Sequence, residues 1–392
     1  MKNNKLLLVV IAYAGFVLLG LSGGLLGVAW PSVQDTFGLS LDAVGTLLLA
    51  STSGYLVSSF VSGPVALRVG SGTLFAVGGV LGLAGMVGYG LAPAWWLMVL
   101  LGFVGGLGSG SIDAGLNAYF ARHHRPSLMN WLHACFGLGA TFGPIVMTAL
   151  LGADLSWRWG YGATGVLFGV LALAFGLTRT RWGSLAPASA GAESEPPAAN
   201  MGVADTLRLS LVWLGIAIFL VYAGIEVSAG QWAYSLFTES RSVTESAAGM
   251  WVSVYWGSLT VGRMVFGSAV GRLGVVRVLR LSMLGVLCGA GMLWWNGADL
   301  VSFLGLALMG FAQAPIFPLL VSITPKRVGD EHAANAIGFQ VAAAGLGVGI
   351  LPGLAGILAA KLGLEIVGPF LLVASIIMLL LHEVLIRSSG RR

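Results

Sequence analysis

Two carboxyl-bearing residues interrupt long apolar stretches of this sequence. Asp113 lies in a run of Leu, Val, Phe, Met and Gly residues, and Glu226 lies in a second such run. A carboxyl group at the centre of a membrane-spanning helix costs about 2.5–3.5 kcal/mol on insertion scales. In a medium of low dielectric constant a carboxyl group favours its protonated form, and it releases the proton when water reaches it. Both residues are therefore candidates for proton coupling, and a hydrogen bond to a neighbouring helix is the structural alternative for each.

Polar residues that could assist Asp113 occur close by. Asn117 follows Asp113 by four residues and shares its helical face, where it could bind substrate. On the next apolar stretch, His133 is expected at a similar depth, where an imidazole could relay a proton or simply order the acid by a hydrogen bond. Asn130, about one turn before His133, is a further candidate for substrate binding.

A second polar set surrounds Glu226. Tyr222 lies four residues before Glu226 on the same helical face, and Gln231 and Trp232 follow soon afterwards. An acid, a phenol and an indole close together suit hydrogen bonding to a polyhydroxylated ring and stacking on it. We therefore expect this stretch to contact substrate, although Trp232 could instead be one of the indoles that mark membrane interfaces.

The remaining candidates are polar or aromatic side chains inside apolar stretches. Trp256 lies near the middle of its span and could contact substrate. Gln313 and Gln340 could contact substrate or could form hydrogen bonds between helices instead. Three arginines are expected to act in gating or in structure rather than in substrate binding: Arg68, Arg263 and Arg272.

The composition indicates a membrane protein. Of the 392 residues, 57% are hydrophobic and 9% are charged, and the mean hydropathy is +0.91. Runs of about 18 or more apolar residues can cross a hydrocarbon layer roughly 30 Å thick at about 1.5 Å per residue. We expect an all-α polytopic membrane protein with twelve transmembrane helices. The expected spans are residues 6–30, 39–65, 73–92, 94–121, 127–152, 160–180, 207–236, 246–270, 276–296, 299–323, 333–360 and 363–386.

The distribution of Lys and Arg predicts the orientation of these spans. With the N-terminus in the cytoplasm, sixteen of the 20 basic residues fall on the cytoplasmic side, as the positive-inside rule requires. We expect an integral protein of the plasma (inner) membrane with both termini in the cytoplasm. The net charge of +5 reflects this bias of the loops, so no nucleic-acid partner is expected.

No signature of an enzyme stands out. The sequence contains no metal-ligand cluster, nucleophile elbow or phosphate-binding loop in a credible context. We therefore expect neither an enzyme nor a metal or cofactor, and a proton gradient would supply the driving force. A non-transporting membrane sensor or scaffold remains an alternative from another class.

A duplicated unit is indicated by an internal repeat. Residues 182–206 are rich in Ala, Ser, Pro and Glu, which predicts a flexible cytoplasmic linker. The linker would separate an N-terminal six-helix bundle (1–181) from a C-terminal one (207–392). Residues 63–70 and 267–274 match at an offset of 204 residues, and Gly106 and Gly310 match at the same offset. Asp113 corresponds to Phe317 in this register, so its acid belongs to one half only.

The repeated loops resemble the cytoplasmic loop motif of the major facilitator superfamily. Both have the form Gly-x4-Arg-x-Gly, although the first copy lacks the usual acidic residue before Arg68. Four stretches are more narrowly similar to the fucose/glucose/galactose:proton symporter group: residues 108–120, 129–144, 221–237 and 310–320. The resemblance implies a monomer of two six-helix bundles that rock about a central site lined by spans 1, 4, 7 and 10. Asp113 and Glu226 fall on spans 4 and 7.

Two departures from the symporter pattern leave alternatives open. Residues 17–33 in the first span contain no acid, so coupling would rest on Asp113 alone or be shared with Glu226. Residues 139–144 also partly resemble a fifth-span motif of drug:proton antiporters. The leading interpretation is proton-coupled symport of a small, sugar-like polar solute, and the alternative is proton-coupled export of an amphipathic or drug-like compound.

Overall fold

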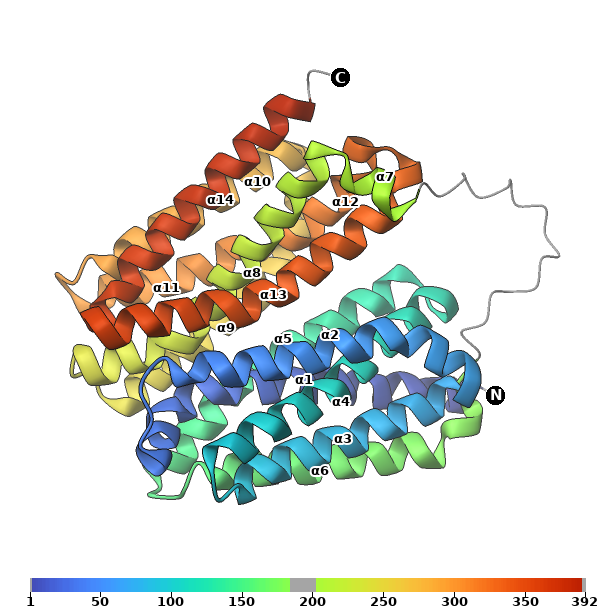
Figure 1. The fold of residues 1–392 in the computed structure, drawn as a ribbon, viewed down its shortest axis with the longest axis horizontal. Coiled ribbons are helices and arrows are strands. Elements are labelled where there is room, and N and C mark those ends of the chain that lie inside the picture. Colours follow the sequence, from blue (N-terminus) through green and yellow to red (C-terminus); the bar gives the residue numbers. More distant parts are fainter. Residues whose placement is uncertain (1, 184–201, 390–392) are drawn as a thin grey trace. The chain divides into compact units, whose positions relative to one another are not determined.

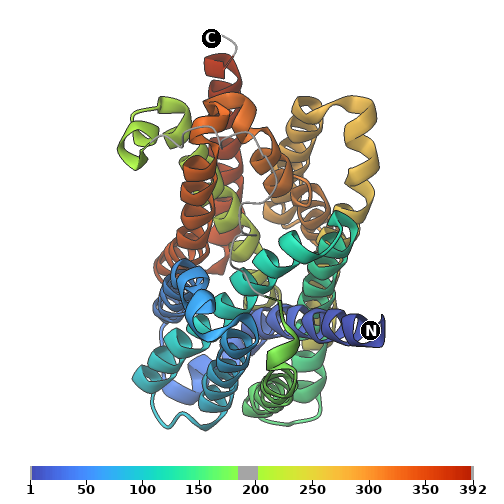
Figure 2. The same ribbon diagram turned by 90° about the vertical axis from the view of Figure 1, so that its right-hand side faces the viewer.

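The computed structural model describes residues 2–183 and 202–389, and only coiled ribbons occur among them in either view (Figures 1 and 2). This all-helical architecture follows from the apolar composition, because a helix satisfies every backbone polar group internally where water is absent. The helices of the N-terminal half are α1 (Lys2–Phe37), α2 (Ala43–Val69), α3 (Ser71–Leu91), α4 (Trp95–His123), α5 (Pro126–Gly152) and α6 (Arg158–Leu177). Those that follow are α7 (Val203–Leu207), α8 (Ser210–Ser235), α9 (Glu245–Leu273), α10 (Val275–Trp294), α11 (Asp299–Gln313), α12 (Ile316–Val328), α13 (Asp330–Leu362) and α14 (Val367–Ser389).

Eleven stretches of the described residues are long and apolar enough to cross a membrane. The remaining expected span coincides with α9, whose 29 residues give a length of about 43 Å. This helix is less apolar because Glu245, Arg263 and Arg272 lie on it. The helices thus coincide with the expected spans, and the protein is an all-α polytopic membrane protein.

The tenth expected span differs from a single helix. It is divided into α11 and α12, which are separated by Ala314 and Pro315. Proline has no backbone N–H and cannot continue the hydrogen-bond ladder of α11, whereas it is well suited to begin a new helix. Pro315 therefore marks the position of the break.

Two compact units make up the chain. The first contains Met1–Pro187 and Ala233–Gly257, and the second contains Ala188–Trp232 and Ser258–Arg392. The first unit thus holds α1–α6 together with the end of α8 and the beginning of α9. The second unit holds α7, the rest of α8 and α9 and all of α10–α14.

Three connections between α-helices consist of a single glycine, and a fourth connection begins with one. Gly70, Gly274 and Gly329 have φ angles of 87°, 78° and 92° and each lies directly between two helices. Gly363 has a φ of 86° and ends α13. This left-handed backbone region is readily adopted only by glycine. Gly70 and Gly274 are related by the offset of 204 residues, so the internal repeat extends to the backbone angles of its turns.

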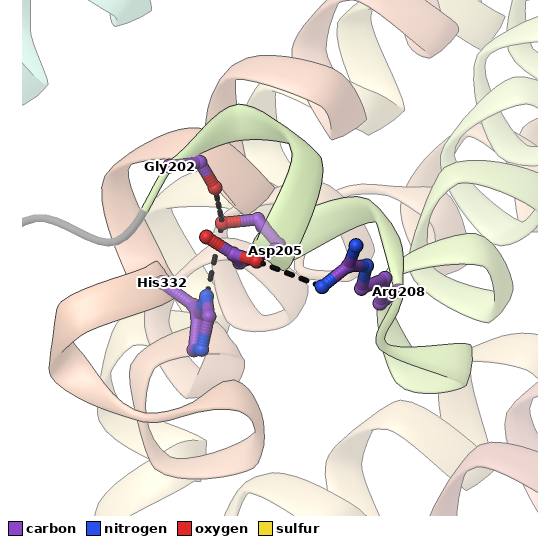
Figure 3. Close-up of polar contacts among 5 residues, drawn as sticks. Gly202, Asp205, Arg208 and His332 are labelled. Carbon is purple, nitrogen blue, oxygen red and sulfur yellow. Dashed lines mark hydrogen bonds and ion pairs between the residues drawn. The ribbon is translucent and has the colours of Figure 1, made fainter.

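The expected linker overlaps residues 184–201, which lie outside the described residues, and both of its ends are held by hydrogen bonds. At the first end, Trp182 is buried and its Nε1 donates to Thr178 Oγ1 at 3.1 Å. At the second end, Thr206 Oγ1 lies 2.9 Å from His332 Nδ1 on α13, beside the exposed ion pair of Asp205 and Arg208 (Figure 3).

Candidate functional sites

Asp113 is bound by two side chains in the first unit. The hydroxyl of Tyr55 on α2 donates to Asp113 Oδ2 at 2.5 Å. Asn117, one turn along α4, donates from Nδ2 to Asp113 Oδ1 at 3.1 Å and to the Asp113 carbonyl oxygen at 3.0 Å. All three side chains are half-buried. The pairing of Asp113 with Asn117 confirms that the two residues share a helical face.

Glycines on α4 bring Tyr55 to Asp113. A Cβ atom at Gly106 would clash with the carbonyl oxygen of Ser51, and one at Gly110 would clash with the carbonyl oxygen of Tyr55. Across the same crossing, a Cβ atom at Gly54 would clash with backbone atoms of α4. The backbones of α2 and α4 therefore touch without intervening side chains, as small residues permit between membrane helices.

Both partners of the Asp113 side chain are uncharged. When the carboxyl group is ionised, Tyr55 and Asn117 donate to it. When it is protonated, its own O–H can donate, and a tyrosine hydroxyl can accept. Tyr55 can thus serve both protonation states of Asp113, so the site can take up and release a proton without rearranging its hydrogen-bond partners.

The second acid has a different environment. Tyr222 is fully buried on α8 and its hydroxyl donates to Glu226 Oε2. Arg263 on α9 also forms a hydrogen bond with Tyr222. Glu226 and Arg263 therefore meet at one tyrosine hydroxyl within the second unit. The surroundings of Glu226 thus include a cation, whereas the two side chains bound to Asp113 are uncharged.

One predicted partner of Asp113, His133, is not part of its hydrogen-bond set. His133 is exposed on α5 and packs edge-on against Phe16, with ring centroids 5.5 Å apart. Among the described residues, the Asp113 side chain is bound by Tyr55 and Asn117 and not by His133. The side chain of Asn130 lies outside the described residues.

Two predicted substrate contacts on α8 are buried. The Trp232 indole has no exposed surface and donates to the carbonyl oxygen of Pro352 at 2.9 Å, which ties α8 to α13. Gln231 is 5% exposed, and its Nε2 has no hydrogen-bond partner among the described residues. An unpartnered buried amide costs about 1–3 kcal/mol, so a ligand hydroxyl that bonded to Gln231 would relieve this cost.

The other predicted residues are distributed over both units. Gln340 is buried and accepts a hydrogen bond from Thr324 at 3.0 Å, and Gln313 is fully buried. Trp256 is half-buried beside Tyr255, with ring centroids 5.1 Å apart. Two of the three arginines are exposed at the ends of α2 and α9, just before the glycine turns that follow these helices: Arg68 and Arg272.

Tyr55 was missed by the sequence analysis. A lone tyrosine in an apolar run is compatible with packing, but Tyr55 lies in a stripe of hydroxyl residues along α2. Ser51 is one turn before Tyr55, and Ser58 and Ser62 follow at helical spacing. A hydroxyl stripe on one face of a membrane helix predicts a polar contact with a neighbouring helix, and this signal could have identified the partner of Asp113.

Comparison with known proteins identifies the family. The model of the Major Facilitator Superfamily matches residues 12–235 and 214–390. Among curated relatives, Bypass of stop codon protein 6 of Saccharomyces cerevisiae is 23% identical over 396 residues, covering 89% of this chain and 76% of that protein. A Protein TsgA homolog of Serratia proteamaculans is 23% identical over 330 residues, covering 82% of this chain and 80% of that protein.

Solved structures share the fold. The nucleoside transporter NupG has a TM-score of 0.73 at 16% identity, covering 98% of each chain. A bacterial homolog of the human lysosomal transporter Spinster has a TM-score of 0.76 at 12% identity, covering 99% of this chain and 98% of that chain. The family match over both halves shows that the chain belongs to the Major Facilitator Superfamily.

Proposed function

We propose that this chain is a proton-coupled symporter that moves a small, sugar-like polar solute by alternating access, with Asp113 as the proton carrier. Transporters of this superfamily are secondary transporters built from repeated six-helix halves, so family membership supports transport. The proton coupling and the class of solute are our proposal. We also place the protein in the plasma (inner) membrane, with both termini in the cytoplasm.

The observation that carries the proposal is the uncharged partner set of Asp113. A carboxylate fixed by a neighbouring cation pays a large penalty if it is neutralised, because the cation is left alone. Asp113 is instead held by Tyr55 and Asn117. Protonation there leaves no unpaired charge, so Asp113 is suited to cycle between its two states.

Glu226 takes a different role in this proposal. Through its link to Arg263 by way of Tyr222, Glu226 would organise hydrogen-bonding groups for substrate. Buried amides in the second unit, at Gln231 and Gln313, support a ligand rich in hydroxyl groups. The likeness in fold to a nucleoside transporter adds nucleosides, which carry a sugar ring, to the solutes worth testing.

The test is proton movement in lightly buffered proteoliposomes. We would record the external pH while adding hexoses, deoxyhexoses, nucleosides or cationic dyes to wild type and to Asp113→Asn. We expect one polar solute to alkalinise the medium with wild type, and the mutation to abolish this signal. Asp299→Asn, which removes an exposed carboxylate at the start of α11, is the matched control and should retain the signal.

Solute exchange without net proton flux separates coupling from binding. Asp113→Asn should still exchange labelled solute across the membrane, because a permanently neutral side chain mimics the protonated carrier. Solute-driven proton uptake that persists in Asp113→Asn would contradict the assignment and direct attention to Glu226. Proton release driven by dyes would instead identify an antiporter, and the absence of flux for every solute tested would favour a sensor or scaffold.

A further inference from the structure

Positive charge gathers at the ends of α10 and α14 that face the cytoplasm in the proposed orientation. Arg277 and Arg280 lie one turn apart near the start of α10, and Arg387 lies near the end of α14. All three arginines are exposed. Glu383 is the only acidic residue in the sequence of either helix, so the two helix ends carry an excess of positive charge.

The two helices pack against each other in opposite directions. Arg280 binds Glu383 through two hydrogen bonds of 2.6 and 2.8 Å. Toward the other end of this helix pair, a Cβ atom at Gly368 would clash with the backbone of Trp294. Nearly equal lengths of α10 and α14 separate these two contacts, so one register holds along the crossing. In this register the side chains one turn beyond the ion pair, toward the cytoplasm, come from Arg277 and Arg387.

These two arginines have no counter-ion. The carboxylate of Glu383 is taken up by Arg280. Within the described part of the chain, Arg277 and Arg387 form neither a hydrogen bond nor an ion pair. Two guanidinium groups at the same level of a helix pair repel each other, and an anion bound to both would relieve this repulsion.

Exposed apolar side chains continue from the arginines along the same two helices. Leu281 and Leu284 on α10 are 58% and 43% exposed, and Leu380 and Val384 on α14 are 59% and 48% exposed. In a polytopic membrane protein such side chains suit contact with hydrocarbon. The order of charged and apolar side chains therefore matches the order of head group and acyl chains in a phospholipid.

The local fold does not require this positive charge. The glycine turns before α3 and α10 are related by the offset of 204 residues and have the same conformation. At this offset Arg277 corresponds to Thr73, and Arg280 corresponds to Ala76. The first half thus forms the same turn and the helix after it without a basic residue at either position. The arginines of α10 are a property of the second half alone.

We propose that the cytoplasmic ends of α10 and α14 bind the head group of an anionic phospholipid, with Arg277 and Arg387 as its counter-ions and the exposed apolar side chains against its acyl chains. Arginine presents donors in a planar fork that matches phosphate oxygens. Basic side chains beside a membrane attract anionic lipids and contribute about fivefold each to the affinity. This surface lies on the second unit and its role does not depend on which solute the protein transports.

Lipid binding by the purified full-length protein tests the proposal without a transport measurement. We would titrate the protein in neutral detergent with dioleoyl phosphatidylglycerol and, separately, with dioleoyl phosphatidylcholine, and measure bound lipid by native mass spectrometry. Phosphatidylglycerol should bind at least about tenfold more tightly, because phosphatidylcholine has no net charge to offer the two arginines. Glycerol phosphate, which lacks acyl chains, should bind at least about tenfold more weakly than phosphatidylglycerol. Equal affinity for the two lipids, or for glycerol phosphate and phosphatidylglycerol, would overturn the proposal.

A double variant tests the two counter-ions. Arg277→Gln combined with Arg387→Gln should weaken phosphatidylglycerol binding about thirtyfold. The matched control removes the same charge from two exposed arginines of the first unit, by Arg179→Gln combined with Arg181→Gln, and should bind as wild type does. Equal losses in the two double variants would show that net charge alone governs binding, and would refute the site.

Glu383→Gln tests the site in the opposite direction. It removes the carboxylate that occupies Arg280, so a third guanidinium group becomes available and phosphatidylglycerol binding should tighten about fivefold. An exposed ion pair contributes little to packing, so α10 and α14 should stay together. Glu331→Gln, which removes an exposed carboxylate at the start of α13, is the matched control and should leave binding unchanged. Because misfolding does not raise affinity, this variant decides the question if the double variant does not fold, and unchanged or weaker binding to it would contradict the proposal.

Discussion

At the scale of single residues, the two intramembrane acids differ in what holds them. Asp113 receives hydrogen bonds from a phenol and an amide, whereas Glu226 shares a tyrosine hydroxyl with an arginine. The first arrangement contains uncharged partners only, and the second includes a cation. In our proposal this difference in partners, rather than depth in the membrane, makes Asp113 the proton carrier.

Tyr55→Phe tests this distinction. The substitution removes the hydroxyl that binds Asp113 but keeps the ring that packs between α2 and α4. A hydrogen bond to a charged group contributes about 1.5–3 kcal/mol, so we expect solute-driven proton uptake to fall about tenfold or more. Solute exchange should change less than proton uptake. The measurement is the ratio of the two rates in proteoliposomes.

The control for Tyr55→Phe lies on the same helix. Ser53→Ala removes an exposed hydroxyl that bonds to the Leu49 carbonyl oxygen of its own helix, and it should leave both rates unchanged. If Tyr55→Phe lowered proton uptake and solute exchange equally, Tyr55 would have a general structural role and no specific role in coupling.

The residue contacts were predictable to different extents. Asn117 was predictable because it shares a helix with Asp113, where the four-residue spacing alone implies the contact. Tyr55 was not identified, because its contact depends on the register between α2 and α4. That register is determined by glycines on both helices. The spacing of residues within one helix does not reveal how that helix packs against another. His133 does not bind the Asp113 side chain, since similar depth on consecutive helices does not imply that two side chains face each other, and its part in proton coupling stays a prediction.

At the scale of helices, backbone-to-backbone contacts hold the first unit together. On α1, a Cβ atom at Gly20 would clash with the carbonyl oxygen of Phe136, and on α5 one at Gly139 would clash with the carbonyl oxygen of Val17. The contact is reciprocal, since each helix places a glycine against the backbone of the other. These crossings rest on van der Waals packing, which small residues maximise in a membrane.

Gly20→Ala should therefore be strongly destabilising. The added methyl group meets rigid backbone of α5, so the two helices must separate, and we expect a loss of about 1–3 kcal/mol. Gly23→Ala is the matched control, because no atom lies within 4 Å of a Cβ atom at that position. It should be neutral or slightly stabilising, since alanine is the better helix former. Thermal unfolding in detergent would compare the two, and equal midpoints would contradict the packing argument.

The helices themselves were largely predictable from apolar runs, since hydrocarbon thickness sets their minimum length. The break between α11 and α12 was not predicted, although Pro315 lies at it. Many membrane helices contain proline without breaking, and α1 continues through Pro31 to Phe37. The different outcomes depend on whether neighbouring groups satisfy the freed carbonyl groups, which is a property of packing and not of the local sequence.

At the scale of the whole molecule, the two halves share a backbone pattern but not a chemistry. Gly70 and Gly274 have the same conformation, while Asp113 corresponds to Phe317. Phe317 packs against Phe219, with ring centroids 5.1 Å apart. Duplication thus supplied the scaffold twice, and the carboxyl group in this register occurs in one copy only.

The proposed orientation in the membrane can be tested by chemical labelling. In a variant with Cys135 and Cys288 replaced by serine, we would introduce Asp154→Cys or Asp205→Cys, one at a time. Asp154 lies between α5 and α6 on the expected outer side, and Asp205 lies on α7 on the expected cytoplasmic side. A membrane-impermeant maleimide should label Asp154→Cys in intact cells, and Asp205→Cys only after permeabilisation. The opposite pattern would invert the topology.

The single-glycine turns at Gly70, Gly274 and Gly329 restrict how this chain can change its length. One inserted residue would rotate the following helix by about 100° about its axis and turn its buried face toward lipid. Gain or loss of residues at these turns would therefore be removed by selection, whereas a substitution on a lipid-facing surface would persist. In distantly related chains, the number of residues between the helices at these turns should therefore stay constant even where most of the sequence has changed.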